Sequence, residues 1–374
     1  MKLSGLKVLD LSAFLPGPML TMMMADHGAE VIKVEPPGAG EPTRSIGAVK
    51  HGQSVYFRNT QRGKRSIQLD LKAPGDLALC LKLAAEADVL VETWRPGVAE
   101  RLGLGYAALS ALNPRLVYCS ISAFGQDGRY AQRPAHDLVI QALAGTIQPG
   151  EGPAPSMPIM LSADALSGMT GLSAVLMALL GRERTGQGDR LDISMYDSLT
   201  AWTANAVGEV FAHGQAPKAA SSRFWGGAAL YDLYQTADAR WIALGGSEPK
   251  FAENLLTGLG RPDLIAAART PPGEGQAPVR AFLAETFKSK ALADWEAWFE
   301  GRDVCWAPVR SLAEAYADPF LTQRGMLAYD AEGCEVIGSP IRFAGEPAQI
   351  DPHAPEPNEH GPAIAAHGWE RPTS

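Results

Sequence analysis

The side chains best suited to acid–base chemistry lie far apart along the chain, each near a predicted turn or helix start. His136 is followed directly by Asp137, and Asp164 comes just before an apolar helical pattern. Glu248 precedes Pro249. Imidazole and carboxyl groups can take up and release a proton near neutral pH when the protein shifts their pKa values. These residues are therefore candidates for proton transfer.

Each of these residues also has a structural interpretation. A single histidine where a loop enters an element, such as His136, is commonly structural. Asp164 could cap its helix, and Ser-Glu-Pro before a helix is a common entry signal that would explain Glu248. The free N–H groups at the start of the Asp164 helix could also stabilise a substrate oxyanion. The residues alone leave both interpretations open.

Two basic segments could bind a phosphorylated ligand. Residues 58–66 hold Arg58, Arg62, Lys64 and Arg65 directly before a predicted strand. The loop at residues 93–97 carries Trp94, which could stack on an adenine, and Arg101 behind it could meet a phosphate. The alternatives are a solvated basic loop and a turn whose tryptophan packs on the core.

The cysteines and the known short motifs exclude several other chemistries. Cys80, Cys119, Cys305 and Cys334 show neither CxxC spacing nor clustering, so we expect reduced thiols, a cytoplasmic location and no zinc site. The chain has no GxSxG elbow and no Walker-type phosphate loop. We expect no metal and no resident cofactor.

The composition is that of a globular protein. Of 374 residues, 46% are hydrophobic and 20% are charged, which excludes disorder as the overall state. The net charge of −8 argues against a nucleic-acid scaffold. The longest apolar stretch, residues 171–180, is shorter than the ~18–20 residues that cross a bilayer, and we expect no membrane span. Residues 1–6 show no signal-peptide pattern.

Strand and helix patterns alternate through the first half of the chain. The first strand (residues 6–11), a helix (19–27) and a second strand (30–35) form a predicted βαβ unit. Further strands at 66–71, 88–92 and 115–121, with a helix at 76–87, continue the alternation. This pattern predicts an α/β fold with a doubly wound parallel sheet, and a ligand outside the carboxyl ends of its strands. The helix within residues 166–180 should pack in the core.

The second half of the chain predicts a smaller domain. Residues 216–222 resemble a linker, and residues 229–234 with 240–244 form a predicted hairpin. The tail, residues 345–374, is rich in Pro, Glu and His, and we expect it to be extended or disordered.

Taken together, the ordered motifs resemble those of the family III CoA-transferase superfamily, and most closely the α-methylacyl-CoA racemases. The shared segments are residues 8–11 with Gly17-Pro18, residues 28–35, Lys64-Arg65-Ser66 with residues 69–72, Arg95-Pro96-Gly97 with Arg101-Leu102-Gly103, and residues 184–188. The resemblance runs from Leu6 to about Phe343. It implies a Rossmann-like large domain (1–215), a small α/β domain (225–318), a C-terminal segment (319–374) that returns to the large domain, and an interlocked homodimer.

The resemblance also implies site residues. The racemases use a His-Asp pair, an aspartate at the start of the long helix and a glutamate before proline, which match His136-Asp137, Asp164 and Glu248. It implies that His136 and Asp164 exchange a proton with the substrate on opposite faces of its α-carbon, while Glu248 orients the imidazole and Asp137 supports the local hydrogen bonds. The enolate donors would be N–H groups at the start of the Asp164 helix.

The same resemblance implies the coenzyme A contacts. The CoA-binding residues it suggests are Leu69, Leu71, Lys72, Thr93, Trp94, Arg95 and Arg101, with Arg62, Lys64 and Arg65 as further phosphate contacts. Some relatives carry a cation directly after the strand that ends at Glu35. Here the nearest is Arg44.

The racemases are favoured over the oxalate-linked transferases at three places. Those transferases carry Tyr-Glu where this chain has His136-Asp137, a Gln at the position of Leu15, and a run of glycines at residues 245–248. Asp164 alone decides nothing, because the transferases use an aspartate there as a nucleophile.

We therefore expect a cofactor-independent racemase of 2-methylacyl-CoA thioesters, with CoA entering as part of the substrate and no nucleic-acid or membrane partner. The alternative is a CoA-transferase that forms a covalent intermediate on Asp164. A third possibility is a CoA-binding protein without catalysis. The acyl group could be a branched fatty acyl, a sterol-derived or an arylpropionyl chain.

Overall fold

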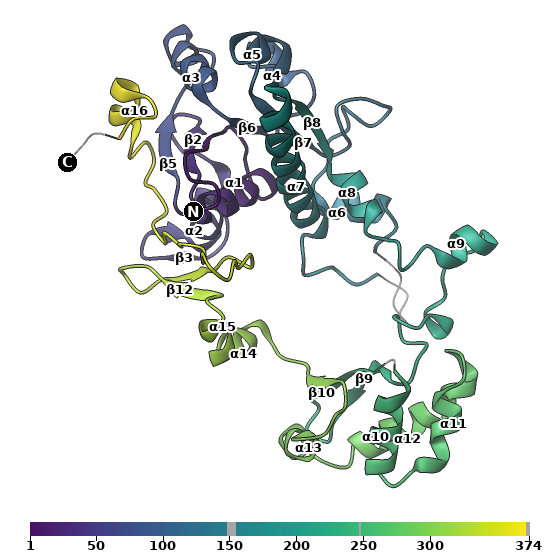
Figure 1. Ribbon diagram of the computed structural model, residues 1–374. Coiled ribbons are helices and arrows are strands. Elements are labelled where there is room, and N and C mark those ends of the chain that lie inside the picture. Colours follow the sequence, from purple (N-terminus) through teal and green to yellow (C-terminus); the bar gives the residue numbers. More distant parts are fainter. Residues whose placement is uncertain (148–154, 247, 372–374) are drawn as a thin grey trace. The chain divides into compact units, whose positions relative to one another are not determined.

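The computed structural model describes residues 1–147, 155–246 and 248–371, and the chain divides into two units (Figure 1). Unit 1 comprises Met1–Thr203 and Pro319–Ser374, and unit 2 comprises Ala204–Asp318. The first boundary lies earlier than the sequence indicated, since residues 204–215 belong to unit 2. The chain returns to unit 1 at Pro319, which is also where the last predicted segment begins.

Unit 1 is built on a parallel sheet with the strand order β5-β2-β1-β6-β7-β8. Its strands are β1 (Lys7–Asp10), β2 (Glu30–Glu35), β5 (Arg65–Gln68), β6 (Val89–Glu92), β7 (Val117–Ser122) and β8 (Arg190–Ser194). The predicted parallel α/β sheet is confirmed. Strand β8 was not predicted, because only the last two of its five residues are buried and its polar start resembles a loop.

Helices cover both faces of this sheet, so adjacent residues of a strand belong to different cores. Val8 packs in the core beneath α1 (Pro16–Asp26) and α7 (Ser162–Thr185), whereas Leu9 packs in the core beneath α3 (Pro74–Glu86) and α5 (Tyr106–Leu112). Strand β6 repeats this alternation. Side chains of a strand point to opposite faces in turn, which is why a strand buried on both faces is apolar throughout.

Shorter elements complete unit 1. The helices are α2 (Val55–Gln61), α4 (Val98–Arg101), α6 (Asp137–Leu143), α8 (Met195–Ala201), α15 (Pro319–Gln323) and α16 (Gly361–His367), with the 3₁₀ turn η1 (Pro42–Ser45). Two hairpins pair β3 (Val49–Lys50) with β4 (Gln53–Ser54) and β12 (Leu327–Tyr329) with β13 (Glu335–Ile337).

The described part of the C-terminal tail is not wholly extended or disordered, contrary to the prediction. Its helix α16 lies along β5, where Ile364 and Trp369 are buried in the same core as α3. The Trp369 indole donates to the Leu83 carbonyl at 3.0 Å. The polar composition of the tail concealed these apolar anchors.

Unit 2 has its own core. Its antiparallel sheet has the order β11-β10-β9, with β9 (Tyr231–Gln235), β10 (Trp241–Gly245) and β11 (Trp306–Pro308). Its helices are α9 (Gly208–His213), α10 (Pro249–Gly258), α11 (Ile265–Ala268), α12 (Ala277–Phe287), α13 (Leu292–Phe299) and α14 (Leu312–Tyr316), and its 3₁₀ turns are η2 (Ala219–Ser221), η3 (Pro262–Leu264) and η4 (Glu274–Gln276). The rings of Phe287, Trp295 and Phe299 pack together at its centre. The predicted hairpin corresponds to β9 and β10.

Helix α7 is longer than the apolar stretch from which it was predicted. By length and composition alone, α7 could cross a membrane, a test that the core helices of soluble proteins also pass. One face of α7 packs on the sheet through Leu172, Val175 and Leu179. The opposite face exposes Met177 and Leu180, each about 70% accessible.

Candidate active site

The strand order reverses at β1, which pairs with β2 on one side and β6 on the other. In open α/β sheets the crevice outside the carboxyl ends at such a reversal is the usual ligand site. The loops after β1 and β6 meet there, because the Ala13 N–H donates to the Thr93 hydroxyl at 2.9 Å. Gly17 is required at this junction, since a Cβ there would lie 2.3 Å from the Ser12 Cβ.

His136 lies beside the loop after β1. It is the N-cap residue of α6, and its ring packs edge-on against Phe14 with 5.6 Å between the ring centroids. Phe14 has a φ of 65°, a left-handed conformation that is unusual for a bulky residue. This contact brings together two predicted parts of the site, His136 and the loop that leads into α1.

Asp137 is a buried carboxylate that joins α6 to the start of α7. Its Oδ1 accepts from the Ala163 N–H at 2.7 Å and from the Asp164 N–H at 3.3 Å, and its Oδ2 accepts from the Gln141 amide at 2.6 Å. Asp137, not Asp164, therefore occupies the first N–H groups of α7. The expectation that these groups are free to hold an enolate oxygen is wrong for Ala163 and Asp164.

Asp164 is the third residue of α7 and is half-buried. No hydrogen bond or ion pair of its carboxylate is found among the residues that the structure describes. Burial, with the nearby Asp137 carboxylate, raises the pKa of Asp164 to about 7. Helix capping therefore does not explain Asp164. Its carboxyl group instead has a pKa near neutral pH, which suits an acid–base group.

Glu248 belongs to unit 2, whereas His136, Asp137 and Asp164 belong to unit 1. It is the N-cap residue of α10, with Pro249 in the first turn, as the helix-entry signal predicted. Its carboxylate makes no capping hydrogen bond. Ser247, its neighbour in the motif, lies outside the described residues. The grouping of Glu248 with His136 stays a prediction.

The basic residues predicted to meet phosphate are buried in unit 1. The Arg62 guanidinium bonds to the Asp26 carboxylate and to the Ile337 carbonyl, the latter at 2.7 Å. Arg65 bonds to Glu30 at 2.6 Å and to the Trp369 carbonyl at 3.1 Å. These side chains hold the C-terminal segment against the sheet. Their guanidinium groups are already engaged and are not available to a CoA phosphate.

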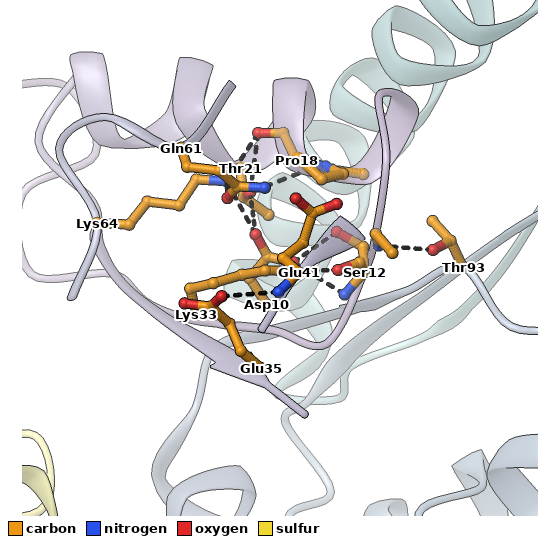
Figure 2. A network of polar contacts seen from close by, with 12 residues as sticks. Asp10, Ser12, Pro18, Thr21, Lys33, Glu35, Glu41, Gln61, Lys64 and Thr93 are labelled. Carbon is orange, nitrogen blue, oxygen red and sulfur yellow. Dashed lines mark hydrogen bonds and ion pairs between the residues drawn. The ribbon is translucent and has the colours of Figure 1, made fainter. Parts of the chain in front are cut away.

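Lys64 belongs to a buried charge network around Asp10, which Figure 2 shows. Its ammonium donates to Asp10 at 2.9 Å, to Gln61 at 2.7 Å and to the Pro18 carbonyl at 2.9 Å. Lys33 pairs with the other Asp10 oxygen at 3.3 Å. Burial lowers the pKa of Lys64 to about 8 against the attraction of Asp10. Lys64 ties the start of α1 and the end of α2 to β1, and its buried ammonium cannot reach a solvent-exposed phosphate.

The other predicted CoA residues lie after the carboxyl ends of β5 and β6. Arg95 and Arg101 follow β6 and are exposed, and so is Lys72, which follows β5. The remaining residues are half-buried or buried: Leu69, Leu71, Thr93 and Trp94. The backbone N–H of Trp94 donates to the buried Glu92 carboxylate at 2.7 Å. This bond fixes the start of the loop after β6. Exposed cations beside an indole suit an adenine nucleotide.

Two neighbours of the site were missed in the sequence. Glu41 is buried and accepts from the Phe14 N–H at 2.7 Å. Tyr56, on α2, has its pKa raised above the usual range by burial and by the charges of Asp164 and Glu41, so its hydroxyl stays protonated. Nothing in the local sequence marks either residue, because both reach the site through segments that contain no familiar motif.

A group of three or more metal-ligating side chains is not found within residues 1–147, 155–246 and 248–371. The four cysteines are free, and Cys305 alone of them is exposed.

Comparison with known proteins places the chain among CoA enzymes. Residues 3–361 match the family model described as CoA-transferase family III. The chain is 35% identical to an acetyl-CoA:oxalate CoA-transferase of Acetobacter aceti, over 96% of this chain and 94% of that protein. It is 34% identical to the human alpha-methylacyl-CoA racemase, over 87% and 82%. A crystal structure of a CAIB/BAIF family protein from Brucella suis superposes with a TM-score of 0.84 at 33% identity, covering 97% of this chain and 98% of that one.

Proposed function

Because this chain belongs to CoA-transferase family III, we propose that it is an acyl-CoA enzyme that inverts the α-carbon of 2-methylacyl-CoA thioesters. The proposal includes a cytoplasmic location and catalysis without a resident cofactor. The observation that carries it is the Asp164 carboxyl, which has no hydrogen-bond partner among the described residues and a pKa raised to about 7. Such a group can both release and accept a proton at physiological pH.

Racemisation needs two acid–base groups, one on each face of the α-carbon. Asp137 bonds to the N–H of Asp164 and is the chain neighbour of His136, so the backbones that carry both groups are tied together. For one enantiomer, His136 removes the α-proton and Asp164 returns a proton to the opposite face. For the other enantiomer the roles exchange, because the starting protonation states are reversed.

The thioester is bound through its CoA portion at the carboxyl edge of the sheet. In this proposal Arg95, Arg101 and Lys72 meet the phosphates and Trp94 stacks on the adenine. The α-carbon then lies near Phe14, within reach of His136. The side group of the substrate must swing between the two bases, and the half-buried Met19 of α1 offers an adaptable surface. Met22 and Met23 are buried and belong to the interior of unit 1.

A homodimer is part of this proposal. The exposed face of α7 carries an apolar stripe of four solvent-accessible side chains, Met169, Leu176, Met177 and Leu180. Contiguous exposed apolar patches commonly mark interaction surfaces. We propose that a second copy of the chain covers this stripe. Glu248 of unit 2 would then orient the imidazole of a His136, either in its own chain or in the partner chain.

The second candidate is CoA transfer between carboxylic acids. The relatives named as transferases favour it, among them a human succinyl-CoA:glutarate CoA-transferase at 31% identity. The Asp164 carboxylate would attack the thioester carbonyl, forming a mixed anhydride and releasing the CoA thiolate. The thiolate would then attack the Asp164 carbonyl, which releases the donor carboxylate and leaves CoA as a thioester on Asp164. The acceptor carboxylate would attack this thioester to form a second anhydride, and the freed thiolate would attack the acceptor carbonyl, giving the new acyl-CoA and free Asp164. His136 and the Glu248-Pro249 pair, which resemble the racemase pattern, favour proton transfer instead.

One experiment separates these functions. The protein is incubated in deuterated water with one enantiomer of a 2-methylacyl-CoA, with and without an added carboxylic acid, and followed by mass spectrometry and chiral analysis. We expect deuterium at the α-carbon and loss of optical purity, independent of the acid and with the thioester intact. Transfer of CoA to the acid without exchange would overturn the racemase and favour the transferase.

Variants of His136 sharpen the result. His136→Ala should lower racemisation by about 10²–10⁴-fold, because one of the two proton carriers is lost. His213→Ala, at an exposed position of unit 2, is the matched control. A transferase would retain much of its activity in His136→Ala, since its covalent chemistry runs through Asp164. Tight CoA binding with no turnover would indicate a binding protein.

A further inference from the structure

The strained residue nearest to His136 is held by a carboxylate from another segment. Phe14 has a φ of 65°, and its ring contacts the His136 ring edge-on. Side chains with a Cβ rarely adopt this backbone conformation, which persists only where surrounding contacts enforce it. The Phe14 N–H donates to Glu41 at 2.7 Å, and this bond supplies such a contact.

Glu41 is itself rigidly fixed. Its N–H donates to the Glu35 carboxylate at 2.9 Å, and Arg44 grips that carboxylate with two bonds of 2.7 Å each. Glu35 ends β2, so the chain of contacts begins in the sheet. Glu41 is 1% exposed, and no cation pairs with it among the residues that the structure describes.

Helix capping accounts for only one of the Glu41 oxygens. Oε2 accepts from the Thr43 N–H at 2.9 Å and from the Thr43 hydroxyl, and through this oxygen Glu41 caps η1. Oε1 accepts from the Phe14 N–H. Burying a carboxylate that no cation contacts directly is costly, and an amide or hydroxyl would cap η1 equally well. The second oxygen therefore points to a further role.

We propose that Glu41 is a positioning residue for His136: it holds Phe14 in the left-handed conformation, and the Phe14 ring in turn fixes the imidazole. This inference rests on the proposed function, in which His136 carries a proton to or from the substrate. Glu41 does not touch the substrate. It acts through the Phe14 ring, which limits the directions in which the imidazole can face.

The primary test does not depend on catalysis. The protein is labelled with ¹³C-histidine, and the ring Cε1–H signal of His136 is assigned by its absence from His136→Asn. In Phe14→Leu this signal should shift, because the ring current of the phenyl group is lost. In Glu41→Ala it should move from the wild-type position towards the Phe14→Leu position, since the phenyl ring is released.

Further variants test whether the change in the signal comes from loss of the fold or from a general effect of substitution. Glu41→Gln is the milder substitution, because one amide cannot accept from both Phe14 and Thr43. Thr43→Val removes the hydroxyl that donates to the Glu41 Oε2 and leaves the Phe14 bond, so it should leave the His136 signal in place. Glu86→Gln removes an exposed ion pair with Lys7 and should also have no effect. A His136 signal that stays at its wild-type position in folded Glu41→Ala would overturn the inference, and so would an unchanged signal in a Glu41→Leu variant, which has no acceptor for the Phe14 N–H.

Kinetics then tie the positioning to turnover. Glu41→Ala should lower kcat about tenfold or more and leave the KM for the acyl-CoA within about twofold. Combined with Phe14→Gly, which has no ring and tolerates positive φ, Glu41→Ala should cost little further activity, because the two act as one path. Fully additive losses would contradict action through Phe14. A wild-type protein that neither racemises 2-methylacyl-CoA nor transfers CoA would overturn the proposed function. The His136 signal would still decide whether Glu41 positions His136.

Discussion

Two aspartates near the site, Asp10 and Asp164, have opposite environments. Asp10 is fully buried between Lys33 and Lys64 and accepts from Thr21 at 2.6 Å. Burial alone would raise its pKa, but the two lysines hold the pKa of Asp10 well below its usual range. Asp164 pairs with no cation in the part of the chain that the structure describes, and burial with Asp137 raises its pKa to about 7.

The difference teaches which carboxylate does chemistry. Asp10 stays charged at every physiological pH, and its bonds tie β1 to the loops around it (Figure 2). Asp164 lies in the first turn of a long helix, where the dipole favours a negative charge, yet its surroundings favour the protonated form. A carboxyl group balanced in this way is suited to proton transfer, and its charge has a cost in stability.

The largest expected effect is the loss of activity in Asp164→Asn. The amide keeps the shape but cannot carry a proton, so racemisation should fall by about 10³-fold. The measurement is α-deuterium exchange in deuterated water. Glu183→Gln, at an exposed carboxylate of the same helix, is the control and should exchange at the wild-type rate. Exchange in Asp164→Asn at more than a tenth of that rate would remove Asp164 from the proton path.

The next effect is on stability, in Asp10→Asn. This change leaves Lys33 and Lys64 without their shared counter-ion, and breaking a buried ion pair in this way costs about 3–5 kcal/mol. Urea unfolding at pH 7 measures it. In Glu86→Gln, which breaks an exposed pair, the free energy of unfolding should change by less than about 1 kcal/mol. Equal losses in the two variants would show that the Asp10 network is not a special source of stability.

Asp164→Asn should have the opposite effect on stability. In the folded protein Asp164 holds its proton up to about pH 7, whereas in the unfolded chain it releases the proton near the ordinary aspartate pKa of 3.8. The carboxyl therefore makes the protein less stable as pH rises from about 4 to about 7. We expect Asp164→Asn to raise the free energy of unfolding by about 1–3 kcal/mol at pH 8, relative to its effect at pH 4. A gain that is the same at both pH values would contradict the raised pKa.

The smallest expected effect is on substrate binding by Arg101, whose side chain is exposed, unlike those of Arg62, Lys64 and Arg65. Arg101→Ala should raise the KM for acyl-CoA about tenfold with little change in kcat, because one charge-assisted phosphate contact is lost. Arg115→Ala, an exposed arginine before the amino end of β7, is the control. An unchanged KM in Arg101→Ala would exclude Arg101 from the CoA site.

The sequence determined the sheet apart from its edge strand β8, and it determined the identity of the chemical groups. Apolar runs such as residues 89–91 predict strands buried on both faces, and the order of strands and helices predicts a parallel sheet. His136, Asp164 and Glu248 were selected by motif resemblance rather than by physical pattern. Their types and order along the chain are properties that a sequence carries directly.

The tertiary structure decided which charges are free and which are engaged. Lys64 and Arg101 are both cations after predicted turns, but Lys64 meets Asp10 from 54 residues away and is buried. Asp137, which lies 26 residues before Ala163, takes the helix N–H groups that Asp164 was expected to cap. Glu41 holds Phe14 across 27 residues. A hydrogen bond depends on atoms meeting in space, and local sequence does not specify the partners that the fold brings from elsewhere.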